Sequence, residues 1–213
     1  MMNYNFFKNY NSILCLNGKL PAKRFFNTDK IIIAADGATN KLAKLGIIPS
    51  LILGDLDSIS HKNMNNGKII PLLNQNETDF EKSLKYLAEN NLTPTLVCGV
   101  NGGFIDHILQ NINIILQNES MFYAPPLVGM VIKQNDFLEL ELPLNSKISL
   151  LGINSRVTTD GLKWELDNNL LEFPGNNSCF NRTIKKTIKI ESLHGKTLIL
   201  IYTNKQIDKG SNH

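Results

Sequence analysis

The hydrophobic pattern changes character near residue 119. Before that point, short continuous apolar runs alternate with segments of helical periodicity. The apolar runs, each expected to form a strand, span residues 13–16, 30–35, 51–53 and 95–99, with a weaker run at 68–73. The segments with helical periodicity span residues 38–45, 78–88 and 105–117. Because continuous apolar strands are typical of parallel sheets covered by helices, we expect an α/β domain with a mostly parallel sheet flanked by helices.

After residue 119 the apolar positions follow a period of two. Residues 137–142 alternate strictly, and Leu162, Trp164 and Leu166 alternate again. Further short strands are expected at residues 147–153, 183–190 and 196–202. This pattern predicts an all-β antiparallel domain, most simply a β-sandwich. Proline at 125 and 126 interrupts regular structure, so the boundary is expected between 118 and 126, with domains 1–120 and 121–213.

Aspartates recur where the apolar runs of the first domain end. They are Asp36, Asp55, Asp57, Asp79 and Asp106. The carboxyl ends of parallel strands open into one crevice, so these side chains are expected to crowd together there. Like charges in such a crevice repel, and a hard divalent cation would relieve the repulsion. Each aspartate taken alone fits a turn or a helix start equally well, so the prediction rests on the group.

Two helix starts add groups that suit an anion. Thr78 and Glu81 have the spacing of a capping box, which places Asp79 in the first helical turn and Lys82 one turn further on. Gly102 and Gly103 precede the next helix, and glycines there let backbone N–H groups approach a phosphate.

Composition excludes several classes of protein. The net charge of +3 is spread evenly, so no basic stripe indicates nucleic acid. No apolar run is long enough to span a membrane, and the first residues lack a signal-peptide pattern, which predicts a cytoplasmic protein. The three cysteines and four histidines show no disulfide or zinc spacing, and neither a P-loop nor a G-x-G-x-x-G motif is present. The single tryptophan, Trp164, fits an inward-facing core position or a stacking platform.

The order of these motifs resembles that of thiamine pyrophosphokinases over residues 31–181. The matching motifs are Ala35-Asp-Gly-Ala-Thr-Asn40, Leu53-Gly-Asp-Leu-Asp-Ser58, Asn74-Gln-Asn-Glu-Thr-Asp-Phe-Glu-Lys82, Gly99-Val-Asn-Gly-Gly-Phe-Ile-Asp-His107 and Gly161-Leu-Lys-Trp164. The resemblance implies an α/β ATP-binding domain followed by a β-sandwich, in a homodimer that holds thiamine between the two kinds of domain from different subunits. It also implies Mg²⁺-dependent transfer of diphosphate from ATP to the thiamine hydroxyl, with AMP as the second product.

The same resemblance assigns expected roles to individual residues. Metal and phosphate chemistry falls to Asp55, Asp57, Asp79 and Lys82. ATP binding falls to Asp36, Ser58, Thr78, Gly102, Gly103 and Asp106. Thiamine binding falls to Trp164, Ser178 and Asn181.

Two positions depart from the family pattern. Phe104 stands where arginine usually follows the glycine pair, and Asn76 stands where an acidic residue is usual. The first change removes a cation from beside the phosphates. This loss raises one alternative, a thiamine-binding protein without turnover. A second alternative, independent of Phe104, is a diphosphokinase for another flat alcohol such as a hydroxymethylpterin.

Overall fold

The computed structural model describes residues 9–55, 57, 60 and 67–203. By contacts between Cα atoms the chain divides into two compact units, and it passes from one to the other between Pro125 and Pro126. The strand at Met121–Ala124, which the expected boundary at 120 assigned to the second domain, therefore belongs with the α/β unit.

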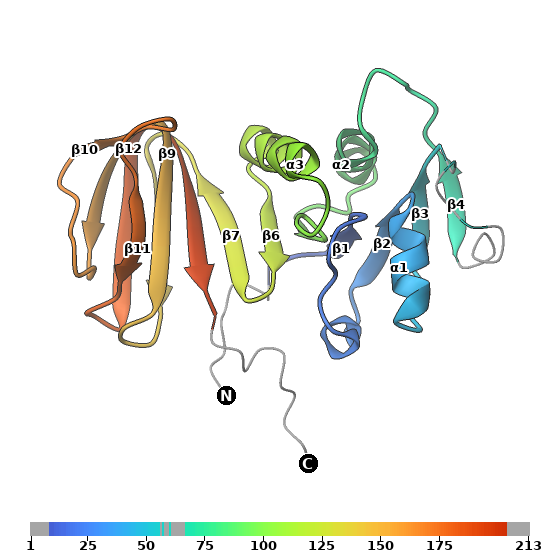
Figure 1. Ribbon diagram of the computed structural model, residues 1–213, viewed down its shortest axis with the longest axis horizontal. Coiled ribbons are helices and arrows are strands. Elements are labelled where there is room, and N and C mark those ends of the chain that lie inside the picture. The colour runs from blue at the N-terminus through green and yellow to red at the C-terminus, as the bar shows by residue number, and fades with distance from the viewer. Residues whose placement is uncertain (1–8, 56, 58–59, 61–66, 204–213) are drawn as a thin grey trace, which may run out of the picture. The chain divides into compact units, whose positions relative to one another are not determined.

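The first unit is a parallel sheet with helices along it (Figure 1). Its strands are β1 (Ser12–Cys15), β2 (Ile31–Ala35), β3 (Leu51–Gly54), β4 (Lys68–Pro71), β5 (Thr95–Cys98) and β6 (Met121–Ala124). Its helices are the 3₁₀ turn η2 (Lys23–Phe26), α1 (Ala38–Lys44), α2 (Asp79–Glu89) and α3 (Ile105–Asn118). The strand order is β6-β5-β1-β2-β3-β4 and every pair is parallel, which confirms the predicted α/β class.

The central strands β1 and β5 are buried along their whole length, which explains why three of the four residues in each are apolar. Cys15 and Cys98 are register partners on these two strands. Both side chains are fully buried, and this burial raises the pKa of each thiol. The third thiol, Cys179, is exposed. Cys15 and Cys98 thus act as small apolar core residues with little thiolate character.

The second unit is antiparallel throughout its described strands, as predicted. They are β7 (Leu127–Ile132), β8 (Asp136–Glu141), β9 (Lys147–Asp160), β10 (Asn169–Leu171), β11 (Ser178–Arg182) and β12 (Thr187–Tyr202). Strands β9 and β12 pair with each other along most of their length, where the sequence pattern predicted shorter separate strands.

The long strand β12 joins two different neighbours. Its first half pairs with β8 and its second half with β7. Between the halves the register shifts near His194, and Gly195 has φ +66°. A Cβ at this glycine would lie 2.1 Å from the carbonyl oxygen of Asn154, so the close approach requires glycine. The bulge allows the single strand β12 to pair with β8 before it and with β7 after it.

Among the described helices, none combines the length and the apolar composition needed to cross a bilayer.

Candidate active site

The candidate site lies where the parallel strands end. A cavity of about 390 Å³ opens there, and every residue that lines it belongs to the α/β unit. Its walls come from the ends of β1, β2 and β5, from the start of α2 and from the first turns of α3. This is the position at which open α/β sheets bind ligands.

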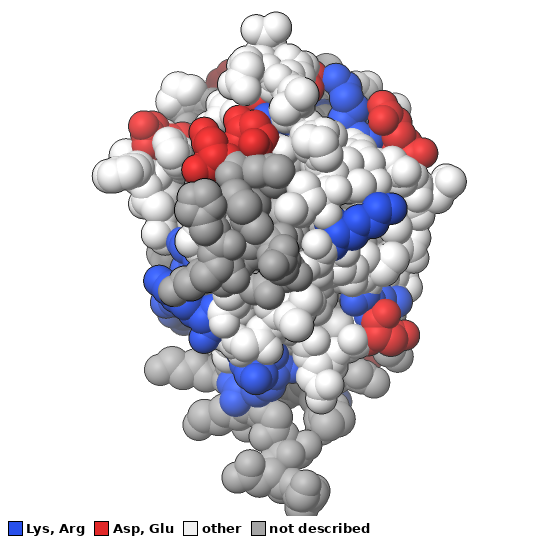
Figure 2. Space-filling view, turned by 90° about the vertical axis from the view of Figure 1, so that its right-hand side faces the viewer, with Lys and Arg blue, Asp and Glu red and all other residues white. Residues whose placement is uncertain are grey.

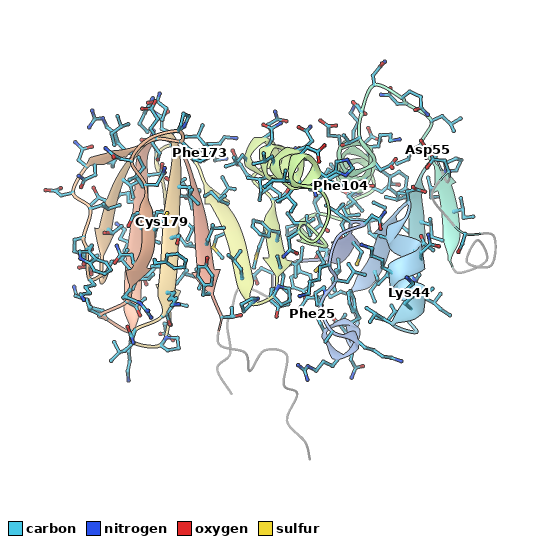
Figure 3. All side chains as sticks on the ribbon, in the orientation of Figure 1. Phe25, Lys44, Asp55, Phe104, Phe173 and Cys179 are labelled. Carbon is cyan, nitrogen blue, oxygen red and sulfur yellow. The ribbon has the colours of Figure 1, made fainter. Side chains whose placement is uncertain are left out.

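Three carboxylates meet beside this cavity. Asp36, Asp55 and Asp79 each offer an oxygen, and these oxygens lie within 4.8 Å of one another. Asp36 is only 5 % exposed. Figure 3 shows Asp55 at the end of β3, and Figure 2 shows acidic side chains gathered near the upper edge of the face that it presents. The predicted convergence of aspartates is therefore observed for these three, two from strand ends and Asp79 from the first turn of α2.

The backbone explains how these carboxylates come so close. The Asp36 N–H donates to the Leu53 carbonyl at 2.7 Å, which ties the end of β2 to β3. Gly54 has φ +144°, and a Cβ at this position would lie 2.9 Å from the Asp36 Cβ and 3.4 Å from an Asp79 oxygen. Only glycine fits without a shift of these neighbours, so Gly54 keeps the space into which the aspartates project.

Asp79 is positioned by the start of α2. Thr78 caps this helix by accepting the Glu81 N–H at 3.2 Å, and the Glu81 carboxylate accepts the Thr78 N–H at 2.8 Å. This is the capping box that the sequence predicted. It fixes Asp79 in the first helical turn, and Thr78 and Asp79 both line the cavity.

Lys82 is a buried cation in this group rather than a solvated helix residue. It is 6 % exposed, and its Nζ lies 2.7 Å from Asp79 Oδ1 and 3.2 Å from the Leu72 carbonyl oxygen. The ammonium group thus offsets part of the negative charge that the three aspartates bring together.

Glycines allow two loops at the cavity to pack closely. A Cβ on Gly18 would lie 2.0 Å from the Gly99 carbonyl oxygen, and one on Gly102, at φ +89°, would lie 2.7 Å from the Lys19 Cβ. Lys41 holds the first loop from α1 by donating from its Nζ to the carbonyl oxygens of Asn17 and Gly18. Gly103 lines the cavity and has open space where a side chain would be.

Phe104 and Asp106 lie near the start of α3 and do not line the cavity. Phe104 is the N-cap residue and is 77 % exposed; it is labelled in Figure 3. The Asp106 carboxylate accepts the N–H of His107 at 2.8 Å. His107 itself lines the cavity with Asn111, one turn further along α3. Sequence reasoning set His107 aside, although the spacing of four residues between His107 and Asn111 places both on one face of α3.

The other predicted residues fall in three places. Asp57 is exposed, and its N–H lies 3.4 Å from Asp55 Oδ1, but it is not one of the three clustered carboxylates. Ser58 lies outside the described residues. In the antiparallel unit, Trp164, Ser178 and Asn181 are brought together by hydrogen bonds of the Asn181 side chain.

Each of the two units matches the model of a known protein family. Residues 22–123 match the model described as thiamin pyrophosphokinase, catalytic domain, and residues 138–196 match thiamin pyrophosphokinase, vitamin B1 binding domain. The two matches follow each other in one chain and together span about three quarters of its 213 residues.

The chain belongs to the thiamin pyrophosphokinase family.

Curated relatives and solved structures agree with this membership. Thiamin pyrophosphokinase 1 of Caenorhabditis elegans is 29 % identical over 175 residues, or 71 % of each chain. Thiamine pyrophosphokinase 3 of rice is 26 % identical over 205 residues, covering 77 % of this chain and 76 % of that protein. The crystal structure of thiamine pyrophosphokinase from Bacillus subtilis superposes with a TM-score of 0.76 at 20 % identity, covering 91 % of this chain and 99 % of that one. At this identity the superposition supports the fold.

Proposed function

We propose that this protein is a Mg²⁺-dependent thiamine diphosphokinase. The observation that carries the proposal is the group of three carboxylates beside a cavity at the sheet edge, in a chain whose family pairs a catalytic with a vitamin B1 binding domain. In the proposed reaction the thiamine hydroxyl attacks the β-phosphorus of ATP. The new bond joins the thiamine oxygen to the β-phosphorus, the hydroxyl proton is released, the bond between the β-phosphorus and the oxygen bridging to the α-phosphorus breaks, and AMP leaves with that oxygen.

The carboxylate group fits a hard divalent cation. Asp36, Asp55 and Asp79 supply oxygen donors within 4.8 Å of one another, the ligand type that Mg²⁺ prefers. When bound, Mg²⁺ would neutralise charge on the transferred diphosphate. Asp57 remains a predicted member of the ligand set because it follows Asp55 by two residues on the same turn.

The surrounding residues are proposed to bind and orient ATP. The loop that ends in Gly102 and Gly103 would bring backbone N–H groups to the phosphates. Thr78 borders the cavity beside Asp79, and Lys82 holds the Asp79 carboxylate in place. Ser58 and Asp106 remain predicted ATP-binding residues. For phosphoryl chemistry, such positioning and charge balance supply most of the rate enhancement.

Thiamine is proposed to bind at the antiparallel unit, with Trp164 as a stacking surface. The Trp164 side chain is 55 % exposed, which excludes the inward-facing core position. We further propose a homodimer in which the α/β unit of one subunit and the antiparallel unit of the other complete each site. A cytoplasmic location remains a prediction from the sequence.

One incubation separates this proposal from its alternatives. Purified protein, ATP, Mg²⁺ and thiamine are expected to yield AMP and thiamine diphosphate in equal amounts. AMP formed only with a hydroxymethylpterin would assign a different alcohol. Tight thiamine binding without AMP would assign a binding protein, the alternative raised by Phe104.

Replacing Trp164 by Ala is expected to raise the KM for thiamine at least about fivefold, with little change in the KM for ATP, because a stacking contact of about 1 kcal/mol is lost. Steady-state kinetics with each substrate varied in turn measures both constants. Phe173→Ala is the matched control, since Phe173 is an exposed aromatic residue of the same unit. Equal changes in both KM values would argue against a stacking role.

Mixing subunits tests the shared site. Trp164→Ala and Asp55→Asn proteins are each expected to be impaired, whereas a mixed dimer contains one site built from two intact halves. Mixing should therefore restore activity above the sum of the two variants. Absence of recovery after proven subunit exchange would show that each site is built within one subunit.

Asp57→Asn is expected to lower turnover by on the order of 10² if this carboxylate completes the metal site. The exchange removes a charge and keeps the side-chain shape. Turnover is measured over a range of Mg²⁺ concentrations. Near-normal turnover at saturating Mg²⁺ would return Asp57 to the role of a turn residue and leave the three clustered aspartates as the ligand set.

A further inference from the structure

The loop that carries Trp164 combines an exposed side chain with a tightly held backbone. It follows β9, and its first residues are the buried Gly161 and Leu162. Leu162 is fully buried and forms a bridge with Thr183. Gly161 has φ +94°, and a Cβ there would lie 3.0 Å from the Thr187 carbonyl oxygen, so the loop can leave the strand in this way only with glycine.

Asn181 of β11 holds the backbone of Trp164 on both sides. Its Oδ1 accepts the Trp164 N–H at 3.1 Å and the Arg182 N–H at 2.8 Å. Its Nδ2 donates to the Trp164 carbonyl oxygen at 2.6 Å and lies 3.1 Å from Ser178 Oγ. The opposite orientation of the amide would set its NH₂ group against two backbone N–H groups, so the contacts fix its orientation.

These four contacts leave Asn181 no free hydrogen-bonding capacity. An asparagine amide offers two donor hydrogens and two acceptor lone pairs, and here all four are in use. The side chain is also only 1 % exposed. The amide of Asn181 can therefore act on a ligand only through Trp164 and Ser178, and this is the form that its predicted thiamine-binding role would take.

Glu165 closes the same loop from its other end. Its Oε1 accepts the N–H groups of Gly161 at 2.7 Å and Leu162 at 2.9 Å, and its Oε2 accepts the Thr159 hydroxyl at 2.6 Å. Thr159 Oγ1 in turn accepts the Leu166 N–H at 2.9 Å. A carboxylate that accepts three hydrogen bonds makes strong, charge-assisted contacts. Hydrogen bonds through Glu165 and Thr159 thus connect the backbone on both sides of Trp164 to the end of β9.

We infer that Asn181 and Glu165 are positioning residues that hold Trp164 as a preformed stacking platform for the flat ring of thiamine. The inference rests on the proposed function. A platform that is ordered before binding avoids the entropy cost of ordering it during binding. Lys163 lies over the indole, with its Nζ 4.8 Å from the ring centroid, so one face of the ring is already engaged and the ligand is expected on the other.

The single tryptophan makes the positioning directly measurable. Because Trp164 is the protein's only tryptophan, time-resolved anisotropy of its fluorescence reports the local motion of this loop alone. Glu165→Ala is expected to increase the fast local component of the anisotropy decay without ligand. It is also expected to raise the KM for thiamine about fourfold, equivalent to about 0.8 kcal/mol and less than the loss expected for Trp164→Ala, with kcat and the KM for ATP within about twofold of wild type.

Three further variants complete the test. Glu165→Gln keeps an acceptor for the two N–H groups and a polar partner for Thr159, so it should restore most of the thiamine affinity and the slow anisotropy. Glu172→Ala is the matched control, because Glu172 is an exposed glutamate of the same unit. Asn181→Ala should resemble Glu165→Ala. Asn181 is buried, so its variant can fail to fold. The result for the exposed Glu165 therefore decides the test.

Wild-type anisotropy and wild-type thiamine KM in Glu165→Ala would overturn the inference. A parallel fall in kcat and rise in both KM values, without rescue by Gln, would also overturn it, because that pattern indicates general damage to the fold. If wild-type protein forms no thiamine diphosphate, the proposed function fails. The anisotropy of Glu165→Ala then still decides whether the carboxylate holds the loop.

Discussion

Asp55→Asn is expected to lower turnover by on the order of 10² or more while the fold stays intact. Asp55 is one of three carboxylates whose oxygens lie within 4.8 Å of one another, and the asparagine has the same shape without the charge. A neutral amide oxygen is a weaker ligand for a hard divalent cation, so the Mg²⁺ concentration for half-maximal rate should rise as well. AMP and thiamine diphosphate formation over a Mg²⁺ series measures both effects.

A control variant separates loss of the proposed metal site from a general loss of negative charge. Asp167 is an exposed carboxylate of the antiparallel unit, so Asp167→Asn should leave turnover and Mg²⁺ dependence unchanged. Thermal unfolding without Mg²⁺ should show Asp55→Asn at least as stable as wild type, because one of three repelling charges is removed. Normal turnover of Asp55→Asn at ordinary Mg²⁺ concentrations would remove Asp55 from the site.

Lys82→Met is expected to reduce kcat/KM for ATP by roughly 10- to 150-fold, the equivalent of losing a charge-assisted contact of about 1.5–3 kcal/mol. Methionine fills similar space without the charge. The buried ammonium lies 2.7 Å from Asp79 Oδ1. Its loss leaves the Asp79 carboxylate without this cation, next to the carboxylates of Asp36 and Asp55. Phosphates would then meet a more negative site. Initial rates at several ATP concentrations, with thiamine saturating, measure the effect.

Lys85→Met provides the matched control on the same helix. Lys85 pairs with Glu77, and its side chain is 61 % exposed, so its replacement should leave ATP kinetics unchanged. Because Mg²⁺ would offset charge that Lys82 no longer balances, added Mg²⁺ should raise the unfolding temperature of Lys82→Met more than that of wild type. If kcat/KM for ATP of Lys82→Met lies within about threefold of the wild-type value, the change is well below the tenfold effect that corresponds to about 1.4 kcal/mol. That result would exclude a role of Lys82 in ATP binding or turnover.

Phe104 allows a rescue experiment. It occupies the N-cap of α3 beside the glycine loop and is 77 % exposed, so an arginine fits there without disturbing the core. Adding Phe104→Arg to Lys82→Met should recover part of the loss, because a cation returns near the phosphates. The same change with Lys82 intact should help little. Equal gains on both backgrounds would show that the two positions act independently.

The sequence alone determined the features that depend on local periodicity and chain direction. Continuous apolar runs predicted the parallel strands, and strict alternation predicted the antiparallel domain. The capping box fixed the start of α2 within one residue. Because carboxyl ends of parallel strands share one edge, the convergence of Asp36, Asp55 and Asp79 was also predictable.

Only the tertiary structure decided which side chains bond to each other. Nothing local distinguishes the exposed Asp57 from the clustered Asp55, or the buried Lys82 from a solvated helix lysine. Two of the four contacts that satisfy Asn181 join β11 to Trp164, 17 residues away in sequence, and they depend on the register of β11 against β9. Hydrogen-bond partners depend on positions fixed to fractions of an ångström by packing across the whole unit, which residue spacing along the chain does not encode.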